Sequence, residues 1–185
     1  MDDHELLARL RQSDQAAFDT LFRAWYPALV RFADGMLRDR AAAEEVAQEA
    51  MLELWRRREQ LDADGSARAY LFQATRNRAL NQIRHARVRE RGAAQLAPAS
   101  EAAPSAQARL EEAELERAVR DAVRTLPERC REVFELSRLH GLRYAEIATT
   151  LGISVKTVEA QMGKALRVLR ARLAPWTGGE RSRAP

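Results

Sequence analysis

The stretch 144–173 constrains the fold more than any other, and it reads YAEIATTLGISVKTVEAQMGKALRVLRARL. A short amphipathic segment ends at Leu151, Gly152 supplies backbone freedom for a sharp turn, and Ser154 is placed to cap a second helix. Apolar residues recur in this second helix at helical spacing and predict an inward face. They are Val158, Met162, Leu166, Leu169 and Leu173. The pattern predicts a helix-turn-helix.

The opposite face of the second helix is small, polar and basic, as entry into a DNA major groove requires. An ordinary helical hairpin with solvated Lys and Arg side chains is the alternative. The candidate DNA contacts of this stretch are Arg143, Ser154, Val155, Lys156, Thr157, Ala160, Gln161 and Lys164.

Positive charge is concentrated in two places, although the whole chain has a net charge of only +4. Residues 61–92 hold seven basic and three acidic residues, and residues 138–173 hold seven basic and two acidic ones. Residues 1–60 hold nine basic and twelve acidic residues. Two separate basic regions suggest two contacts with a polyanion, while the acidic part favours a protein partner.

Several classes of function are disfavoured by composition. Cys130 is the single cysteine, so neither an intramolecular disulfide nor a cysteine zinc site is expected. No nucleophile with a matching base, metal cluster or phosphate-binding loop is recognisable, so we expect no enzyme, cofactor or metal. The chain lacks an apolar run of about 18 residues and an obvious signal peptide. We therefore expect a cytoplasmic protein without membrane insertion.

The fold is expected to be all-α, in two small helical domains joined by a flexible linker, because Gly and Pro are sparse and strand-like alternation is absent. The expected boundaries are 1–92 for the first domain, 93–109 for the linker, 110–174 for the second domain and 175–185 for a disordered tail. Ser13 and Asp14 are placed to open the long helix that follows them, and Asp39 and Ser66 to cap later helices. Thr125 with Glu128 fits a capping box.

Two helices of the first domain have distinctive surfaces. The helix that follows Asp39 carries an acidic flank with apolar neighbours, which suits a basic protein partner. Its candidate contacts are Glu44, Glu45, Gln48, Glu49, Met51, Leu52 and Trp55. The helix that follows the loop 61–66 presents arginines and amides, which suit single-stranded or opened nucleic acid. Its candidate contacts are Arg76, Asn77, Asn81, Arg84 and Arg87.

Taken together, three segments resemble bacterial sigma factors of the extracytoplasmic-function group (group 4 of the sigma-70 family). They are AAAEEVAQEAMLELWRR, SARAYLFQATRNRALNQIR and LPERCREVFELSRLHGLRYAEIATTLGISVKTVEAQMGKALRVLR, in that order on both sides of the linker. Such factors usually carry Trp where Tyr70 stands, Asp where Asn81 stands, and Ser or Thr where Arg143 stands. The form SVKTVE…KAL resembles the subgroup tied to iron-siderophore signalling.

The resemblance implies a sigma-2-like domain and a sigma-4-like domain. The acidic helix would bind the β′ clamp coiled coil of core RNA polymerase, and the second domain would sit on the β flap. The loop 61–66, through Asp62, Asp64 and Ser66, and the basic helix of the first domain would recognise and melt the −10 element. The helix from Ser154 would read the −35 element of promoter DNA. An anti-sigma factor would be a further partner.

Two other functions remain open at this point. SVKTVEAQMGKAL also resembles the helix-turn-helix of free-standing LuxR-type regulators, although their sensory domains mix strands and helices, and residues 1–92 show no strand pattern. A protein-only helical adaptor is the third possibility, and it predicts no salt-sensitive DNA binding.

Overall fold

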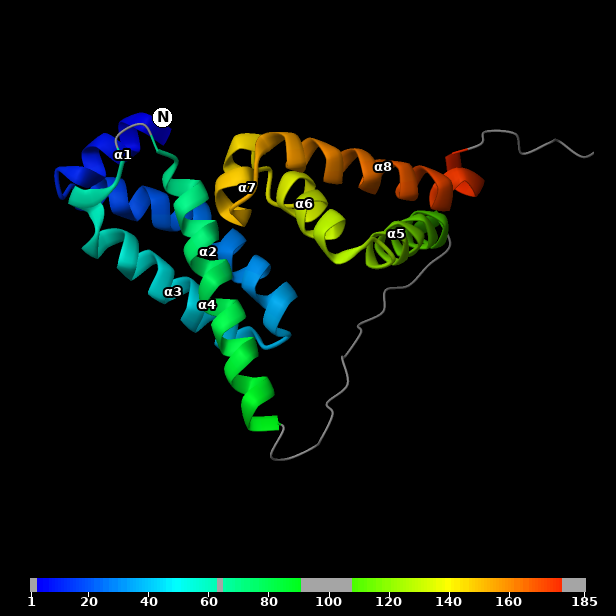
Figure 1. Ribbon diagram of the computed structural model, residues 1–185, viewed down its shortest axis with the longest axis horizontal. Helices are drawn as coiled ribbons and strands as arrows, with labels where there is room; N and C mark the ends of the chain where they lie inside the picture. Colours follow the sequence, from blue (N-terminus) through cyan, green and yellow to red (C-terminus); the bar gives the residue numbers. More distant parts are fainter. Residues whose placement is uncertain (1–2, 63–64, 91–107, 178–185) are drawn as a thin grey trace, which may run out of the picture. The chain divides into compact units, whose positions relative to one another are not determined.

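The computed structural model describes residues 3–62, 65–90 and 108–177, and this part of the chain is helical without strands (Figure 1). The all-α prediction is confirmed. The elements are α1 (Asp3–Arg11), α2 (Gln15–Leu37), α3 (Arg40–Arg56), the 3-10 turn η1 (Arg58–Gln60), α4 (Ala67–Glu90), α5 (Ala108–Arg124), α6 (Glu128–Arg138), α7 (Tyr144–Leu151) and α8 (Val155–Thr177).

The described residues form two compact units. The first holds α1 to α4 together with residues 145–153, and the second holds α5, α6 and α8 with the residues around them. The expected linker lies almost wholly in 91–107, outside the described residues.

In the first unit, α2, α3 and α4 pack together around one apolar core (Figure 1). Asp14 caps α2 by accepting hydrogen bonds from the backbone N–H groups of residues 16 and 17, and Asp39 caps α3 in the same way. Between these helices Arg38 adopts a left-handed conformation (φ 54°), which ends α2. The Ser66 hydroxyl accepts from the Ala69 N–H at 3.1 Å at the start of α4. The three predicted caps are therefore confirmed.

The core of the first unit is built from large apolar side chains on all of its long helices. Phe32 of α2 and Phe72 of α4 meet with ring centroids 5.3 Å apart. Burial of this kind contributes on the order of 2 kcal/mol per large side chain. The largest buried side chains of this core include Leu7, Leu10, Leu21, Leu29, Met51, Leu54, Leu71 and Phe72.

Residues 145–153 carry two buried polar side chains whose partners lie in the first unit. Thr150 Oγ1 donates to the Ala69 carbonyl at 3.4 Å, and Ser66 Oγ donates to Glu146 Oε1 at 2.9 Å. These bonds compensate for removing Glu146 and Thr150 from water.

In the second unit, α8 packs along α5 and α6 (Figure 1). Its core contains Ala122, Leu126, Cys130, Ala165 and Leu169. Val158 and Met162 of the predicted inward face are also buried.

Several local expectations for 110–185 were wrong. No side chain caps α6, because its cap position is Pro127, and the Thr125 hydroxyl bonds instead to the Ala122 carbonyl. Leu166 was expected to face inward but is 38% exposed, and Ala165 takes its place in the core. Helix α5 begins at Ala108, ahead of the expected 110, and α8 continues to Thr177, past the expected tail boundary at 174.

Candidate nucleic-acid and protein interfaces

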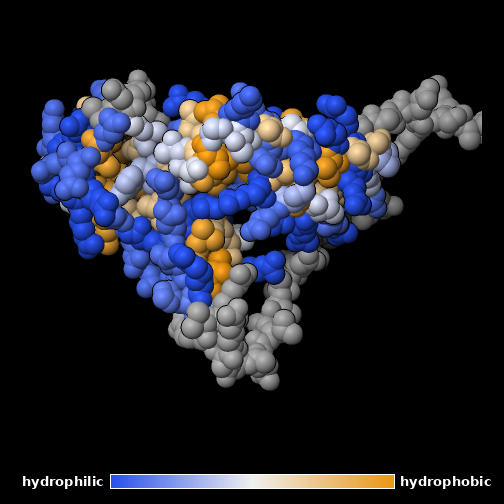
Figure 2. Space-filling view, in the orientation of Figure 1, coloured by the Kyte–Doolittle hydropathy of each residue, from blue (hydrophilic) through white to orange (hydrophobic). Residues whose placement is uncertain are grey.

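Helix α3 presents the acidic surface that its sequence predicts. Glu45, Gln48 and Glu49 are exposed, and Leu52 one turn further on is 49% exposed. The visible surface over α3 in Figure 2 is largely hydrophilic. This helix therefore offers carboxylates and one exposed apolar side chain, a combination that suits a basic amphipathic partner.

Met51 does not belong to that surface. Its side chain is only 1% exposed and packs in the core of the first unit, so the prediction that it contacts a partner is corrected. Met51 shares the buried side of α3 with Ala47 and Leu54, one position away from the exposed Leu52. Trp55 is half-buried, with its ring centroid 5.1 Å from that of Phe18 on α2.

An ion-pair network behind the acidic surface joins α3 to α4. Arg78 of α4 donates a hydrogen bond to Glu53, and its Nε lies 3.3 Å from Glu49 Oε2. Arg57 approaches Glu53 at 3.0 Å. The hydrogen bond from Arg78, supported by the nearby positive charges, lowers the pKa of the Glu53 carboxyl below its ordinary value. Sequence reasoning did not find Arg78, because its partners lie 25 and 29 residues earlier in the chain.

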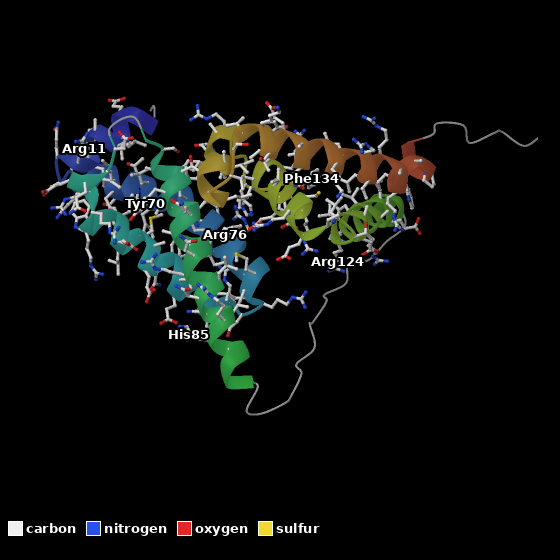
Figure 3. All side chains as sticks on the ribbon, in the orientation of Figure 1. Arg11, Tyr70, Arg76, His85, Arg124 and Phe134 are labelled. Carbon is white, nitrogen blue, oxygen red and sulfur yellow. The ribbon has the colours of Figure 1, made fainter. Side chains whose placement is uncertain are left out.

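The predicted nucleic-acid residues of α4 lie along its outer side. Asn77, Asn81 and Arg84 are exposed, Arg76 is half-buried, and Arg84 donates a hydrogen bond to the Asn81 amide oxygen. Figure 3 labels Tyr70, Arg76 and His85, which follow one another along this helix. The face therefore combines guanidinium groups with amides.

The loop before α4 is described in part. Asp62 is exposed, and its carbonyl accepts from the Gly65 N–H at 3.1 Å. Asp64 lies outside the described residues, and the Arg87 side chain also falls outside them. Ser66 caps α4, as described above.

Two aromatic residues lie near the start of α4. The Arg68 guanidinium stacks over the Trp25 ring of α2, 4.2 Å from its centroid. Burial raises the pKa of the Tyr70 hydroxyl, and the negative charge of Glu53 adds to that effect. The Arg68–Trp25 contact was missed at the sequence level, since no local pattern marks a pairing between residues 43 positions apart.

In the second unit the first turns of α8 carry most of the predicted major-groove residues. Ser154 caps the helix by accepting from the Thr157 N–H at 3.1 Å. Gly152 in the preceding turn has φ +65°, as the predicted turn requires. The exposed residues of the predicted set are Arg143, Ser154, Val155, Lys156, Thr157, Ala160 and Lys164.

Gln161 differs from the other members of this set. Its side chain is half-buried, and its amide oxygen accepts a hydrogen bond from the buried Cys130 thiol at 3.0 Å. This bond ties Gln161 to α6 and directs it away from the fully exposed row. Arg167 and Arg170 further along α8 are exposed and extend the basic surface beyond the predicted residues.

Within the described ranges, no group of three or more His, Cys, Asp or Glu side chains could hold a metal ion. In the same ranges, no helix is both long enough and apolar enough to span a membrane.

Two family models match the chain. Residues 21–89 match the model described as Sigma-70 region 2, and residues 116–169 match that described as Sigma-70, region 4. The first match covers α3 and almost all of α4, and the second covers α6, α7 and most of α8.

Known proteins resemble the chain over nearly its full length. The ECF RNA polymerase sigma factor SigK of Mycobacterium tuberculosis is 32% identical over 171 residues, which cover 89% of this chain and 90% of SigK. The structure of CnrH in complex with the cytosolic domain of CnrY aligns with a TM-score of 0.64 and 27% identity, covering 94% of this chain and 97% of that one. The sigma factor RpoE of Bartonella quintana, solved with the anti-sigma factor NepR, shares the fold at a TM-score of 0.62 and 23% identity, covering 85% of this chain and 96% of RpoE. The chain therefore belongs to the extracytoplasmic-function (ECF) family of sigma-70 RNA polymerase sigma factors.

Proposed function

We propose that the chain binds core RNA polymerase and directs it to promoters by recognising −35 and −10 elements and helping to melt the DNA. The observation that carries this proposal is the pair of exposed basic helix faces, one on α4 and one on α8, each within a matched sigma region. The region 2 match to residues 21–89 disfavours the LuxR-type regulator, because such a regulator has a sensory domain in that position. The expected division into a first domain, a linker and a second domain remains part of the proposal, with the helices of the second domain running from Ala108 to Thr177.

The proposed polymerase contact is the outer face of α3. Glu45, Gln48, Glu49 and Leu52 are available there, with Glu44 beside them in an ion pair to Arg40 at 2.8 Å. Carboxylates on one face complement a basic partner and speed its association. The β′ clamp coiled coil is the proposed partner for this face, and the β flap is proposed for the second unit. An anti-sigma factor is proposed as a competing partner, by analogy with the solved RpoE complex.

The proposed −35 contact is the first half of α8. Lys156 and Lys164 lie two turns apart and are both exposed, so both can reach phosphates or base edges along one groove. Each phosphate neutralised on duplex DNA steepens the salt dependence of binding by about 0.9 in log–log slope. A good bidentate base contact contributes about 1–3 kcal/mol of discrimination. For the half-buried Gln161 we propose a positioning role in this surface.

The proposed −10 contact is the outer side of α4 with the loop before it. Asn77 and Asn81 offer amide groups to unpaired base edges, and Arg76 and Arg84 offer guanidinium groups to phosphates. Capturing an unstacked base must offset an unstacking cost of a few kcal/mol. Melting therefore depends on this face rather than on α8.

In vitro transcription with core polymerase and a genomic promoter library, with and without the chain, tests the proposal. New start sites that depend on the chain are expected, and their absence refutes the proposal. Promoter binding that is equally strong without core polymerase favours a free-standing regulator instead.

A second experiment separates the two DNA contacts. Arg84→Ala should reduce promoter opening, measured by permanganate footprinting, without changing −35 preference. Lys156→Ala should weaken and relax −35 recognition, while the DNA that is still bound opens normally. Arg31→Ala, which removes an exposed arginine of α2, is the matched control and should leave both readouts unchanged. Normal opening with the Arg84 variant contradicts the assignment of α4.

A further inference from the structure

Beside the acidic face of α3 lies a row of aromatic rings on α2 that the proposed function does not use. The rings of Phe22 and Tyr26 stack with centroids 4.6 Å apart, and those of Phe18 and Phe22 lie 6.3 Å apart. The row ends where Phe18 meets Trp55 of α3. All four rings are half-buried, so each keeps part of its surface in contact with solvent.

At the end of this row the surface is hollowed. The hollow is lined by Gln15, Phe18 and Asp19 from α2 and by Leu52 and Trp55 from α3. These two helices pack side by side in the first unit (Figure 1), so the hollow lies in the seam between them. Leu52, on its wall, is the most exposed large apolar side chain described in the first unit.

The walls of the hollow are held in place by neighbouring groups. The Arg58 guanidinium covers the Trp55 ring at 4.6 Å from its centroid. Arg58 is itself fixed, because it donates to the Ser13 hydroxyl and to the Trp55 carbonyl, both at 2.8 Å. At the other end of the row, the Gln48 amide donates to the Tyr26 hydroxyl at 3.3 Å. A site whose walls are already fixed loses little side-chain entropy on binding.

The charge of the exposed side chains around the hollow changes from negative to positive along α3. The exposed carboxylates of Glu45 and Glu49 precede Leu52, and the exposed Arg56 follows it by one turn. Asp19 adds a further carboxylate from α2. A helix that docks here therefore meets negative charge on one side of its apolar contact and positive charge on the other.

We propose that this hollow receives one bulky apolar side chain from a helix of core RNA polymerase, with basic residues of the same helix lying over Glu45, Glu49 and Asp19. The hollow is the apolar anchor point of the docking surface, and the charge order along α3 sets the direction of the docked helix. This inference rests on the proposed function and adds Gln15, Phe18 and Asp19 of α2 to the surface. An aromatic pocket surrounded by polar groups is the usual form of an interface hot spot.

Binding of the full chain to core polymerase, measured by competition against a fluorescently labelled wild-type chain, tests the proposal. Leu52→Ala should raise Kd by about tenfold, and Phe18→Leu should raise it by about fivefold. Asp19→Asn should raise it by about threefold, since an exposed ion pair contributes less. Circular dichroism of each variant checks that the helices are retained.

Matched controls lie near the other end of α2. Met36→Ala truncates a half-buried apolar side chain, and Asp34→Asn makes the same charge change as Asp19→Asn about 22 Å further along the helix axis. Both should bind within twofold of the wild type. If they weaken binding as much as Leu52→Ala and Asp19→Asn do, the loss is not specific to the hollow and the proposal fails.

A third arm separates this inference from the function on which it rests. The double variant Glu45→Gln and Glu49→Gln removes charge from α3 without touching the hollow. If it weakens binding while Leu52→Ala and Phe18→Leu do not, the hollow is refuted and docking through α3 stands. If the wild-type chain does not bind core polymerase, the proposed function itself is refuted.

Discussion

The structure predicts a loss of stability most clearly for the substitution Arg78→Ala. Arg78 is the α4 partner of both Glu49 and Glu53 on α3. Its side chain is 25% exposed and that of Glu53 is 21% exposed, so solvent screens their interaction only in part. Removing the guanidinium leaves the Glu53 carboxylate with Arg57 as its nearby cationic partner.

The size of the effect follows from the chemistry of that contact. Hydrogen bonds to charged groups contribute about 1.5–3 kcal/mol when shielded, and exposed ion pairs contribute under about 1 kcal/mol. The exposure of this pair lies between the two cases, so we expect Arg78→Ala to lower the free energy of unfolding of the first unit by about 1.5 kcal/mol. Arg78→Lys, which keeps the charge but loses the planar fork, should lose about half as much.

Urea unfolding followed by tryptophan fluorescence measures this loss. Trp25 and Trp55 report on the first unit, and a Trp176→Phe background removes the signal from α8. With a urea m-value of about 1–1.5 kcal/mol/M, the midpoint should fall by about 1 M. Arg40→Ala breaks the more exposed Arg40–Glu44 pair and serves as the control, with an expected loss below about 0.5 kcal/mol.

The pH dependence gives an independent check. Because the folded-state pKa of Glu53 is lowered, its contribution to stability is present above the ordinary value of 4.5 and is lost as pH falls through the lowered value. The gap between wild type and Arg78→Ala should therefore be constant near neutral pH and should close in strong acid. A gap that persists unchanged in strong acid, or a control as destabilised as Arg78→Ala at neutral pH, refutes the reasoning.

Three further predictions concern single positions. Thr75 is fully buried and its hydroxyl has no hydrogen-bond partner among the described residues, so Thr75→Val should raise the free energy of unfolding by about 0.5–1 kcal/mol in the same urea assay. Gly152→Ala should lower the free energy of unfolding by about 1 kcal/mol, measured by thermal unfolding. The added Cβ would meet nothing within 4 Å, so the loss comes only from the positive φ, which alanine adopts unfavourably. Burial raises the pKa of Glu135 above 4.5, so stability should fall as pH rises from 4.5 through the raised value, and Glu135→Gln should flatten that part of a stability-versus-pH curve.

Features that depend on neighbouring residues could be predicted from the sequence. The caps at Asp14, Asp39 and Ser66 were correct because a capping side chain bonds to N–H groups two or three residues away. The capping box at Thr125 was wrong for an equally local reason. Pro127 takes the cap position, and the Thr125 hydroxyl turns back to a carbonyl of α5.

Contacts between distant segments could not be predicted from periodicity. Arg78 with Glu53, Arg68 with Trp25, and Gln161 with Cys130 pair residues on different helices, and no spacing within one helix marks them. Periodicity also placed Leu166 wrongly on the inward face, since a stripe of apolar residues gives the inward direction only to within about one position. The assignments of individual residues to DNA or polymerase remain predictions for the experiments above.

The length of helix α8 has a mechanical consequence. This element is a single helix of 23 residues, roughly 34 Å long. Val158 and Met162 are buried in its first turns, near Lys156, and Ala165 and Leu169 further along pack in the core of the second unit. Such a rod transmits rotation without changing its own length, so a tilt of roughly 5° about Leu169 displaces Lys156, roughly 20 Å away along the axis, by about 2 Å. For the proposed −35 and −10 contacts, any adjustment to the distance between the two DNA sites is therefore expected from joints outside α8, because the helix itself keeps a fixed length.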